Sequence, residues 1–293
     1  MTGDPADDIT SASASTASAS TVSASTGSAG PGPDAFDTSV AHIARVYNYW
    51  LGGKDNYAAD REAAEQVIAA YPPIYTSVRA QRAFLGRAVH YLVAEAGIRQ
   101  FLDIGTGLPS ADNTHEVAQR EAPESRIVYV DKDPIVLAHA RALLTSSAQG
   151  ATEYVDADLR DTGEILKQAA GILDSGKPVA VMLLGVLHCI PDDDGPGAIV
   201  TRLLAAVPSG SYLVIAHPAR DIHTSQITTA ADRANPMMAE PVTLRTHDEV
   251  SRFFPGLDLV EPGLVQLHRW RPGPEGPVPG HDIANYGAVA RKP

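Results

Sequence analysis

Cysteine is nearly absent from the sequence, because Cys189 is the only one among 293 residues. A single cysteine forms neither an intrachain disulfide nor a zinc site built from cysteines, and such usage is typical of a reducing compartment. No apolar run approaches the ~20 residues that a membrane-spanning helix needs, and the first residues lack the basic and apolar regions of a signal peptide. We therefore expect a cytoplasmic protein with no membrane partner.

Basic residues are also few. Lys and Arg number 23 against 35 Asp and Glu, which gives a formal net charge of -12 at pH 7. An acidic protein repels the phosphates of nucleic acids unless it carries a local basic patch. The densest basic cluster, Arg79, Arg82 and Arg87, has helical spacing and is interpreted as a solvated helix face. We therefore expect no nucleic-acid partner.

Residues 11–29 contain almost only Ser, Ala and Thr, and a Gly-Pro-Gly-Pro stretch follows them. Such small side chains bury too little apolar surface to offset the entropy that is lost when a backbone becomes ordered. The sequence therefore predicts a disordered tail over residues 1–33. The whole chain, with 44% hydrophobic and 20% charged residues, is otherwise typical of a globular protein.

Three stretches with helical periodicity follow the tail and predict a helical cap over residues 34–97. Each stretch is bounded by residues that commonly begin or end helices. The predicted helices are one capped by Thr38 or Ser39 and ended by Gly52 and Gly53, one over 60–70 ended by Pro72, and one over 77–96 ended by Gly97.

From residue 98 onward, short runs rich in Val, Ile and Leu alternate with amphipathic stretches. This alternation is typical of a buried parallel sheet with right-handed crossovers, so residues 98–293 are predicted to form a doubly wound, Rossmann-like α/β domain. The expected strands are 98–105, 126–131, 152–158, 178–185, 211–217 and 286–292. The expected helices are 111–121, 134–146, 163–173, 195–207 and 246–254.

Glycines and polar residues follow each of the first four predicted strands. Ligands of such sheets bind outside the carboxyl ends of the strands, so these residues are expected to lie together. They are Asp103 to Gly107 after the first strand, Asp131 and Lys132 after the second, Asp158 and Leu159 after the third, and Gly185 and His188 after the fourth.

The residue types in this series favour an adenosine site. Gly105 and Gly107 have no Cβ, so the backbone can turn sharply close to a ligand. Asp131 is placed to accept both hydroxyls of a ribose, and Asp158 to accept from the amine of an adenine. The structural alternatives are a plain turn for the glycines, and solvated strand ends or helix caps for the two aspartates.

The loop after the first strand also indicates which adenosine cofactor is bound. The pyrophosphate of a dinucleotide favours a third glycine, where this sequence has Ser110, and few nearby carboxylates, whereas Asp103 lies beside the loop. S-adenosylmethionine has a sulfonium, an ammonium and no phosphate, so it suits this loop better. A dinucleotide-dependent oxidoreductase is the alternative.

Four stretches resemble class I S-adenosylmethionine-dependent methyltransferases: DIGTGLPSADNTHEVAQ at 103–119, VYVDKDPIVLAHARALL at 128–144, ADLRD at 157–161 and MLLGVLHCIPD at 182–192. Two further stretches point to a narrower family: ARVYNYWLGGKDNYAADREAAEQV at 44–67 and NYGAVARKP at 285–293. With them, residues 36 to 293 resemble the actinobacterial S-adenosyl methyltransferase family, formerly a domain of unknown function.

The resemblance implies a mostly parallel, seven-stranded sheet of order 3-2-1-4-5-7-6, whose seventh strand is antiparallel. It also implies which residues bind the cofactor. These are Asp103, Gly105, Thr106 and Gly107 for the methionine part, Asp131 for the ribose, Asp158 and Leu159 for the adenine, and Gly185 beside the transferable methyl.

The segment YNYWLGGKDNY, residues 47–57, is interpreted as a lid in which a helix and a Gly-Gly hinge close over the cofactor. Its aromatic rings would also attract a sulfonium through cation–π interaction. The alternative is an aromatic face that only packs against the core. The cofactor contacts expected from the lid are Tyr47, Asn48, Gly53 and Asn56.

His188 is the candidate general base, because it follows the fourth strand on the ligand side. His217 holds a comparable position after the fifth strand, and either histidine could instead be structural. Asp192 to Asp194 are interpreted as a cap of the next helix rather than as a magnesium site. No histidine pair has zinc spacing, so no metal is expected.

The sequence thus predicts a methyltransferase that uses S-adenosylmethionine to methylate a small-molecule acceptor. The leaving group is already activated, so such an enzyme mainly aligns the acceptor with the methyl and excludes water. This explains why no catalytic triad is visible. The alternative from another class is a regulatory or accessory protein that binds the cofactor without catalysis. The acceptor and the oligomeric state stay open.

Overall fold

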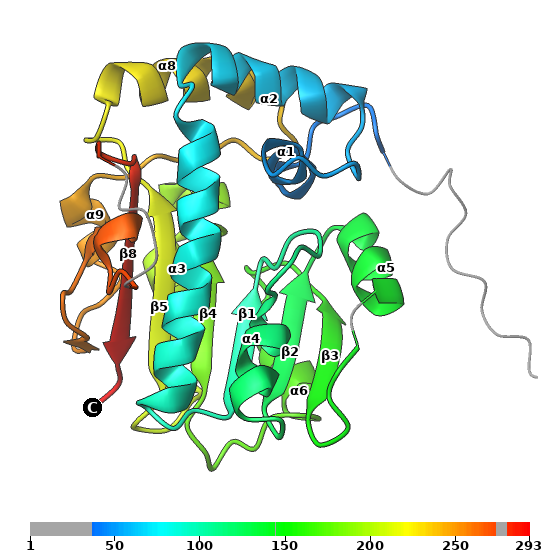
Figure 1. Ribbon diagram of the computed structural model, residues 1–293, viewed down its shortest axis with the longest axis vertical. Helices are drawn as coiled ribbons and strands as arrows, with labels where there is room; N and C mark the ends of the chain where they lie inside the picture. The colour runs from blue at the N-terminus through cyan, green and yellow to red at the C-terminus, as the bar shows by residue number, and fades with distance from the viewer. Residues whose placement is uncertain (1–36, 144, 274–279) are drawn as a thin grey trace, which may run out of the picture. The chain divides into compact units, whose positions relative to one another are not determined.

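A mixed sheet lies at the centre of the protein (Figure 1). The computed structural model describes residues 37–143, 145–273 and 280–293, so the tail predicted over 1–33 lies outside the described residues. In the described part, eight strands form the sheet. They are β1 (Gln100–Ile104), β2 (Arg126–Asp131), β3 (Ala151–Asp156), β4 (Ala180–Leu184), β5 (Tyr212–Pro218), β6 (Asp258–Leu259), β7 (Val265–Gln266) and β8 (Asn285–Arg291).

The strand order is β3-β2-β1-β4-β5-β8-β6, with β7 also paired to β8. Strands β1 to β5 are parallel to their neighbours, and β8 is antiparallel to β5, β6 and β7. With β8 as the seventh strand and β6 as the sixth, this is the predicted order, and the doubly wound α/β fold is confirmed. The described part of the structure has eight strands where the resemblance implied seven, because the two-residue β7 also pairs with β8.

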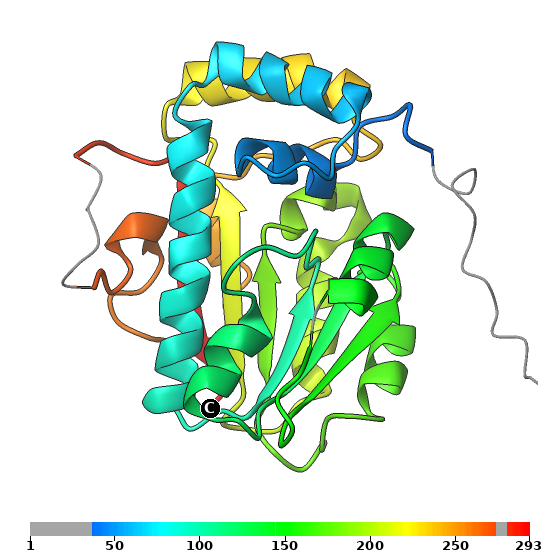
Figure 2. The same cartoon turned by 45° about the vertical axis from the view of Figure 1, so that its right-hand side comes forward.

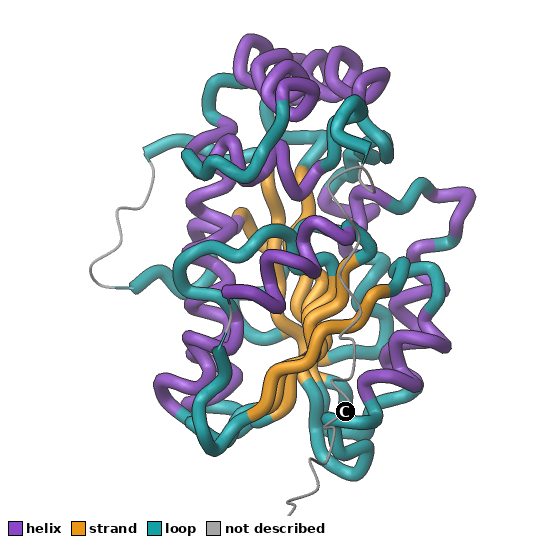
Figure 3. The backbone as a smooth tube through the Cα atoms, turned by 90° about the vertical axis from the view of Figure 1, so that its right-hand side faces the viewer, coloured by secondary structure: helices purple, strands orange, loops and turns teal. Residues whose placement is uncertain are grey.

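The central strands are buried on both faces by helices, as Figure 3 shows. Successive side chains of a strand point to opposite faces. Phe101 accordingly packs in the core beside α3 and α4, while Leu102 packs in the core beside α6 and α7. The helices around the sheet are α3 (Ile74–Ala94), α4 (Thr114–Glu121), α5 (Pro134–Leu143), α6 (Thr162–Ala169), α7 (Pro196–Ala205) and α9 (His247–Ser251).

A helical cap lies over the carboxyl ends of the parallel strands (Figure 2). It consists of α1 (Ile43–Trp50), α2 (Ala58–Ala70) and α8 (Thr224–Ala234), and α2 lies against α8. The third helix of the segment 34–97, α3, packs on the sheet instead. Val67 of α2 and Ile227 of α8 share one apolar core. No helix was expected at α8, because its sequence TSQITTAADRA has few apolar residues and its buried face is completed by α2.

The first helix begins later than its sequence suggests. α1 starts at Ile43, and His42 Nδ1 accepts a hydrogen bond from the backbone N–H of Ala44 at 3.4 Å. The prediction that Thr38 or Ser39 caps this helix was wrong. Ser39 instead donates from its backbone and its hydroxyl to Asp37 Oδ1 at 2.9 and 2.6 Å.

A buried carboxylate joins α1 to α2. Asp60 has no exposed surface and accepts hydrogen bonds from Arg45 Nε at 3.0 Å and from the backbone N–H groups of His42 and Tyr57 at 2.9 and 2.8 Å. Arg45 is itself 4% exposed. Neither charge is solvated, so each depends on the other for compensation.

Short 3-10 turns connect several of these elements. They are η2 (Leu187–Cys189), η3 (Asp192–Asp194), η4 (Asn235–Met237) and η5 (Leu267–Arg269). None of the helices within the described residues combines the length and the apolar composition that crossing a membrane requires.

The first prediction concerns the Arg45–Asp60 pair. Asp60→Ala leaves the Arg45 guanidinium buried without a counter-charge, which typically costs about 3–5 kcal/mol. The free energy of unfolding, measured by urea denaturation at pH 7, should fall by about that amount.

The matched control is Glu62→Ala, which removes an exposed carboxylate from the same helix. Its effect should stay within about 0.5 kcal/mol, as for most surface substitutions. An equal fall in the free energy of unfolding for both variants would show that the buried pair contributes no more to stability than an exposed carboxylate does.

Candidate functional site

A cavity of about 220 Å³ lies between the carboxyl ends of the strands and the cap. One water molecule needs only roughly 10–15 Å³ of such space, so the cavity has room for a ligand. Most residues predicted for the site line it together. They are Tyr47, Asp103, Gly105, Thr106, Gly107, Asp131, Lys132, Asp158, Leu159, Gly185 and His188.

The remaining predicted residues lie beside this cavity. Asn48 and Gly53 line an adjoining hollow, which Tyr47 and Thr106 also border. Asn56 lines neither space in the described part. Its side-chain Nδ2 donates to Asn48 Oδ1 at 2.9 Å and to the Gly53 carbonyl at 3.0 Å, so it holds the turn after α1 together.

The glycines of the site meet tight backbone requirements. Gly105 and Gly185 have φ values of 73° and 82°, in the left-handed region that favours glycine. A Cβ on Gly105 would lie 2.4 Å from Val186 Cβ, and one on Gly185 would lie 2.5 Å from Gln81 Nε2. Turn geometry and packing therefore explain these two glycines, whether or not a ligand approaches them.

Asp103 is a buried carboxyl at the end of β1. It is 6% exposed and accepts a hydrogen bond from Thr114 Oγ1 at 2.6 Å. Burial raises the pKa of Asp103 to about 6, while the Thr114 hydroxyl and the nearby Arg82 guanidinium act in the opposite direction. A cation that bound beside it would favour the ionised form.

Asp131, the last residue of β2, links two loops. Its Oδ2 accepts from the Gly107 backbone N–H at 2.9 Å, and its Oδ1 accepts from the Asp133 backbone N–H at 2.9 Å. Burial raises the pKa of Asp131, although both backbone N–H groups act to lower it. The carboxylate thereby holds the glycine loop in place, and Asp131 lines the cavity.

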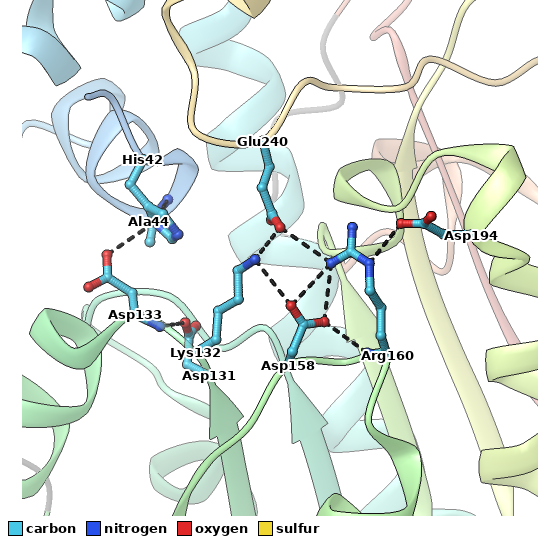
Figure 4. A network of polar contacts seen from close by, with 9 residues as sticks. All are labelled: His42, Ala44, Asp131, Lys132, Asp133, Asp158, Arg160, Asp194 and Glu240. Atoms are coloured by element: carbon cyan, nitrogen blue, oxygen red, sulfur yellow. Dashed lines mark hydrogen bonds and ion pairs between the residues drawn. The ribbon is translucent and has the colours of Figure 1, made fainter. Parts of the chain in front are cut away.

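A network of charged side chains borders the site beyond β2 and β3 (Figure 4). Lys132 Nζ lies 3.2 Å from Asp158 Oδ2 and also pairs with Glu240. Arg160 Nη1 lies 3.1 Å from Asp158 Oδ2 and 3.3 Å from Glu240 Oε1, and its Nε lies 2.7 Å from Asp194 Oδ2. The network joins the strand ends to the segment that follows the cap helix α8.

The network includes the carboxylate of Asp158, which was predicted to bind adenine. Asp158 accepts two hydrogen bonds from Arg160 Nη1, one from the Arg160 backbone N–H and one from Lys132 Nζ. Burial alone would raise the pKa of Asp158, but the Arg160 N–H and the Lys132 ammonium lower it below its usual value. An ionised carboxylate has about four acceptor sites, so an adenine amine would have to replace one of these donors.

His188, which follows β4, and His217, which lies near the end of β5, differ in the hydrogen bonds of their ring nitrogens. His217 Nδ1 bonds the Pro218 carbonyl at 2.9 Å and its Nε2 lies 2.8 Å from Arg245 Nη1, so both ring nitrogens are engaged. His188 is 8% exposed, and its Nδ1 has no hydrogen-bond partner among the described residues. Burial and then the Arg245 charge lower the pKa of His188 to about 4, so its ring is neutral at pH 7.

Two arginines of α3 have roles that their helical spacing did not indicate. Arg82 Nη2 donates to the carbonyls of Ala111 and Asp112 at 3.0 and 2.8 Å, and the side chain lines the cavity. Arg87 Nε donates to the Trp270 carbonyl at 2.9 Å. The solvated-face interpretation was therefore wrong for both, because their partners come from loops distant in sequence.

The acidic run Asp192 to Asp194 forms η3 and does not cap α7 as expected. The N-cap of α7 is Gly195, whose φ of 64° is left-handed. Asp192 Oδ1 instead pairs with Arg245 Nη2 at 2.7 Å, and Asp194 pairs with Arg160. Within the residues that the structure describes, no group of three His, Cys, Asp or Glu side chains is arranged to hold a metal ion.

The chain matches a known protein family over most of its length. The family model described as S-adenosyl methyltransferase matches residues 30–293. The chain belongs to the S-adenosyl methyltransferase family. S-adenosyl-L-methionine is its cofactor, and it is an S-adenosylmethionine-dependent methyltransferase, which confirms the resemblance that the strand-end stretches indicated.

Two solved structures of similar proteins support this membership of the S-adenosyl methyltransferase family. A DUF574 family protein from Streptomyces avermitilis MA-4680 has 46% identity and a TM-score of 0.85, with 88% of this chain and 99% of that one covered. A candidate methyltransferase from Thermobifida fusca YX has 38% identity and a TM-score of 0.80, with 90% and 99% covered. No curated protein matches the chain.

The second prediction concerns the buried Asp103. Its pKa of about 6 exceeds the ordinary 3.8, so its contribution to stability is complete below about pH 4 and is lost as pH rises through 6. Two pKa units correspond to roughly 3 kcal/mol. In urea denaturation without cofactor, Asp103→Asn should therefore gain up to about 3 kcal/mol relative to the wild type between pH 4 and pH 7.5.

A second variant tests the cause of this pH dependence. Thr114→Val removes the hydroxyl that lowers the Asp103 pKa, so the loss of stability should extend to higher pH and become larger. A constant stability difference between Asp103→Asn and the wild type across this range would contradict the burial of a titrating carboxyl.

Proposed function

We propose that the protein transfers the methyl group of S-adenosylmethionine to a small-molecule acceptor held beneath the cap. The observation that carries this proposal is one cavity lined both by the strand-end residues and by residues of α1, α2, α3 and α8. S-adenosylmethionine supplies a methyl bound to a positively charged sulfur. The part of the cavity beneath the cap gives an acceptor a place from which water is excluded.

The residues at the strand ends fit this cofactor chemically. Asp131 offers two buried carboxylate oxygens to the ribose hydroxyls, and Asp103 offers a carboxylate to the ammonium. Arg82 lines the same cavity and would pair with the carboxylate of the methionine part. Leu159, which is 5% exposed, would contribute apolar contact to the adenine.

His188 would position the acceptor rather than remove its proton efficiently. A general base works best when its pKa lies near the working pH, and the pKa of His188 is lowered to about 4. A neutral imidazole still accepts a hydrogen bond from a hydroxyl or amine. With an activated leaving group, alignment of this kind supplies much of the rate enhancement.

A regulatory protein that only binds the cofactor is the second candidate function. It would need the strand-end residues but no space for an acceptor. The extension of the cavity among α2, α3 and α8 therefore favours methyl transfer.

Transfer of a labelled methyl tests the proposal directly. The protein is incubated with methyl-labelled S-adenosylmethionine and a panel of neutral hydroxyl and amine compounds, and label in any compound supports transfer to a small molecule. Binding of S-adenosylhomocysteine without label in any of them would favour the regulatory function. Binding of NADH in place of S-adenosylhomocysteine, measured by calorimetry, would contradict both.

The third prediction assigns the ribose to Asp131. Asp131→Asn should weaken the binding of S-adenosylhomocysteine at least tenfold, which corresponds to about 1.4 kcal/mol, because an amide is a weaker acceptor than a carboxylate. A 2′-deoxy analogue should bind the wild type weakly but should bind Asp131→Asn nearly as well as the parent compound. Calorimetric titration of both ligands completes the double-mutant cycle.

Asp156→Asn is the matched control, because Asp156 is exposed and pairs in register with Asp131 across β2 and β3. It should leave both affinities within twofold of the wild type. If the two ligands instead lose affinity equally on Asp131→Asn, the carboxylate acts on the loop alone and the ribose assignment is wrong.

A further inference from the structure

We infer that the methyl acceptor is an apolar, uncharged molecule that binds among α2, α3 and α8. This inference rests on the proposed function and specifies its substrate class. The space concerned, here called the cap chamber, is the part of the cavity lined by Val67, Tyr71, Val78, Ile227, Ala231 and Ala234.

Charge is distributed unevenly around the cavity. Its charged lining residues come from the strand ends, from Arg82 and from Glu240. Among the described residues that line the cavity, those of α2 and α8 are all apolar. A charged group on the acceptor would lose its hydration in the cap chamber without gaining a partner, which is strongly unfavourable.

The polar side chains of Tyr71, Ser77 and Asn235, close to the cap chamber, already have protein partners. The Tyr71 hydroxyl lies 3.3 Å from Ser77 Oγ and accepts from the Ala284 backbone N–H at 3.2 Å. The Asn235 side chain bonds the backbone carbonyl and N–H of Val242 at 3.1 and 2.8 Å. To bind a polar ligand, these groups would have to give up the contacts that hold the cap together.

His188 provides the complementary polar contact. It lines the same cavity from η2 and is 8% exposed. As a neutral ring it can meet one hydroxyl or amine. An apolar body with a single neutral polar group therefore matches the chamber better than a charged acceptor does.

The test compares probes that share one ring system. 2-Naphthol, 2-naphthoate and 2-naphthylmethylammonium are titrated calorimetrically at pH 7.5 into the full chain loaded with S-adenosylhomocysteine. We expect 2-naphthol to bind at least tenfold more tightly than either charged probe. Equal or tighter binding of a charged probe, or failure of 2-naphthol to bind, would overturn the inference.

A pair of alanine variants locates the probe. Ala231→Leu adds bulk to the chamber from α8, whereas Ala69→Leu makes the same change at an exposed position of α2. Ala231→Leu should weaken the binding of 2-naphthol at least tenfold and leave the affinity for S-adenosylhomocysteine within twofold of the wild type. Ala69→Leu should change neither affinity. If the leucine variant does not fold, Ala231→Val makes a smaller increase in side-chain volume at the same position.

Unchanged 2-naphthol affinity in the folded Ala231 variants would place the probe outside the chamber and overturn the inference. Failure of the wild type to bind S-adenosylhomocysteine would instead contradict the proposed function. The same comparison of probes on the unloaded protein would then still test the chamber.

Discussion

The site depends on carboxylates buried where the parallel strands end. Asp131 joins the loop after β1 to the turn after β2 by accepting from Gly107 and Asp133, and the nearby Asp103 is also buried. Burial is the main cause of the raised pKa of Asp103, and repulsion by the Asp131 charge adds to it, against the opposing effect of the Arg82 guanidinium. A ligand with a sulfonium and an ammonium relieves this repulsion, whereas a pyrophosphate would increase it.

The cap completes the site from segments that are distant in sequence. α1 and α2 precede the sheet and α8 follows β5, yet α2 and α8 share one apolar core. The buried Asp60 ties α1 to α2, and Glu240 after α8 joins the cap to Lys132 and Arg160 at the strand ends. Most charged side chains that line the cavity lie at the strand ends, and the lining residues of α2 and α8 are apolar. A methyltransferase benefits from this division, because its work is alignment and the exclusion of water.

Much of the fold and of the candidate site could be predicted because they follow local patterns. Most of the parallel strands are rich in apolar residues, and parallel strands bring the residues after them to one edge, so Asp103, Asp131 and Gly185 line one cavity. Features that depend on distant partners could not be predicted. α8 has few apolar residues, and its buried face forms only against α2. Glu240 lies far from its partner Lys132 in the chain. The same limit explains why Arg82 and Arg87 of α3 were misinterpreted, whereas Arg79 is exposed as expected.

The most direct test of the account is a crystal structure of the full chain with S-adenosylhomocysteine. The account predicts that the ribose hydroxyls lie within about 3 Å of the Asp131 carboxylate. It also predicts that the sulfur faces the space beneath α2 and α8. A ligand bound away from Asp131, or one whose sulfur points out to solvent, would contradict it.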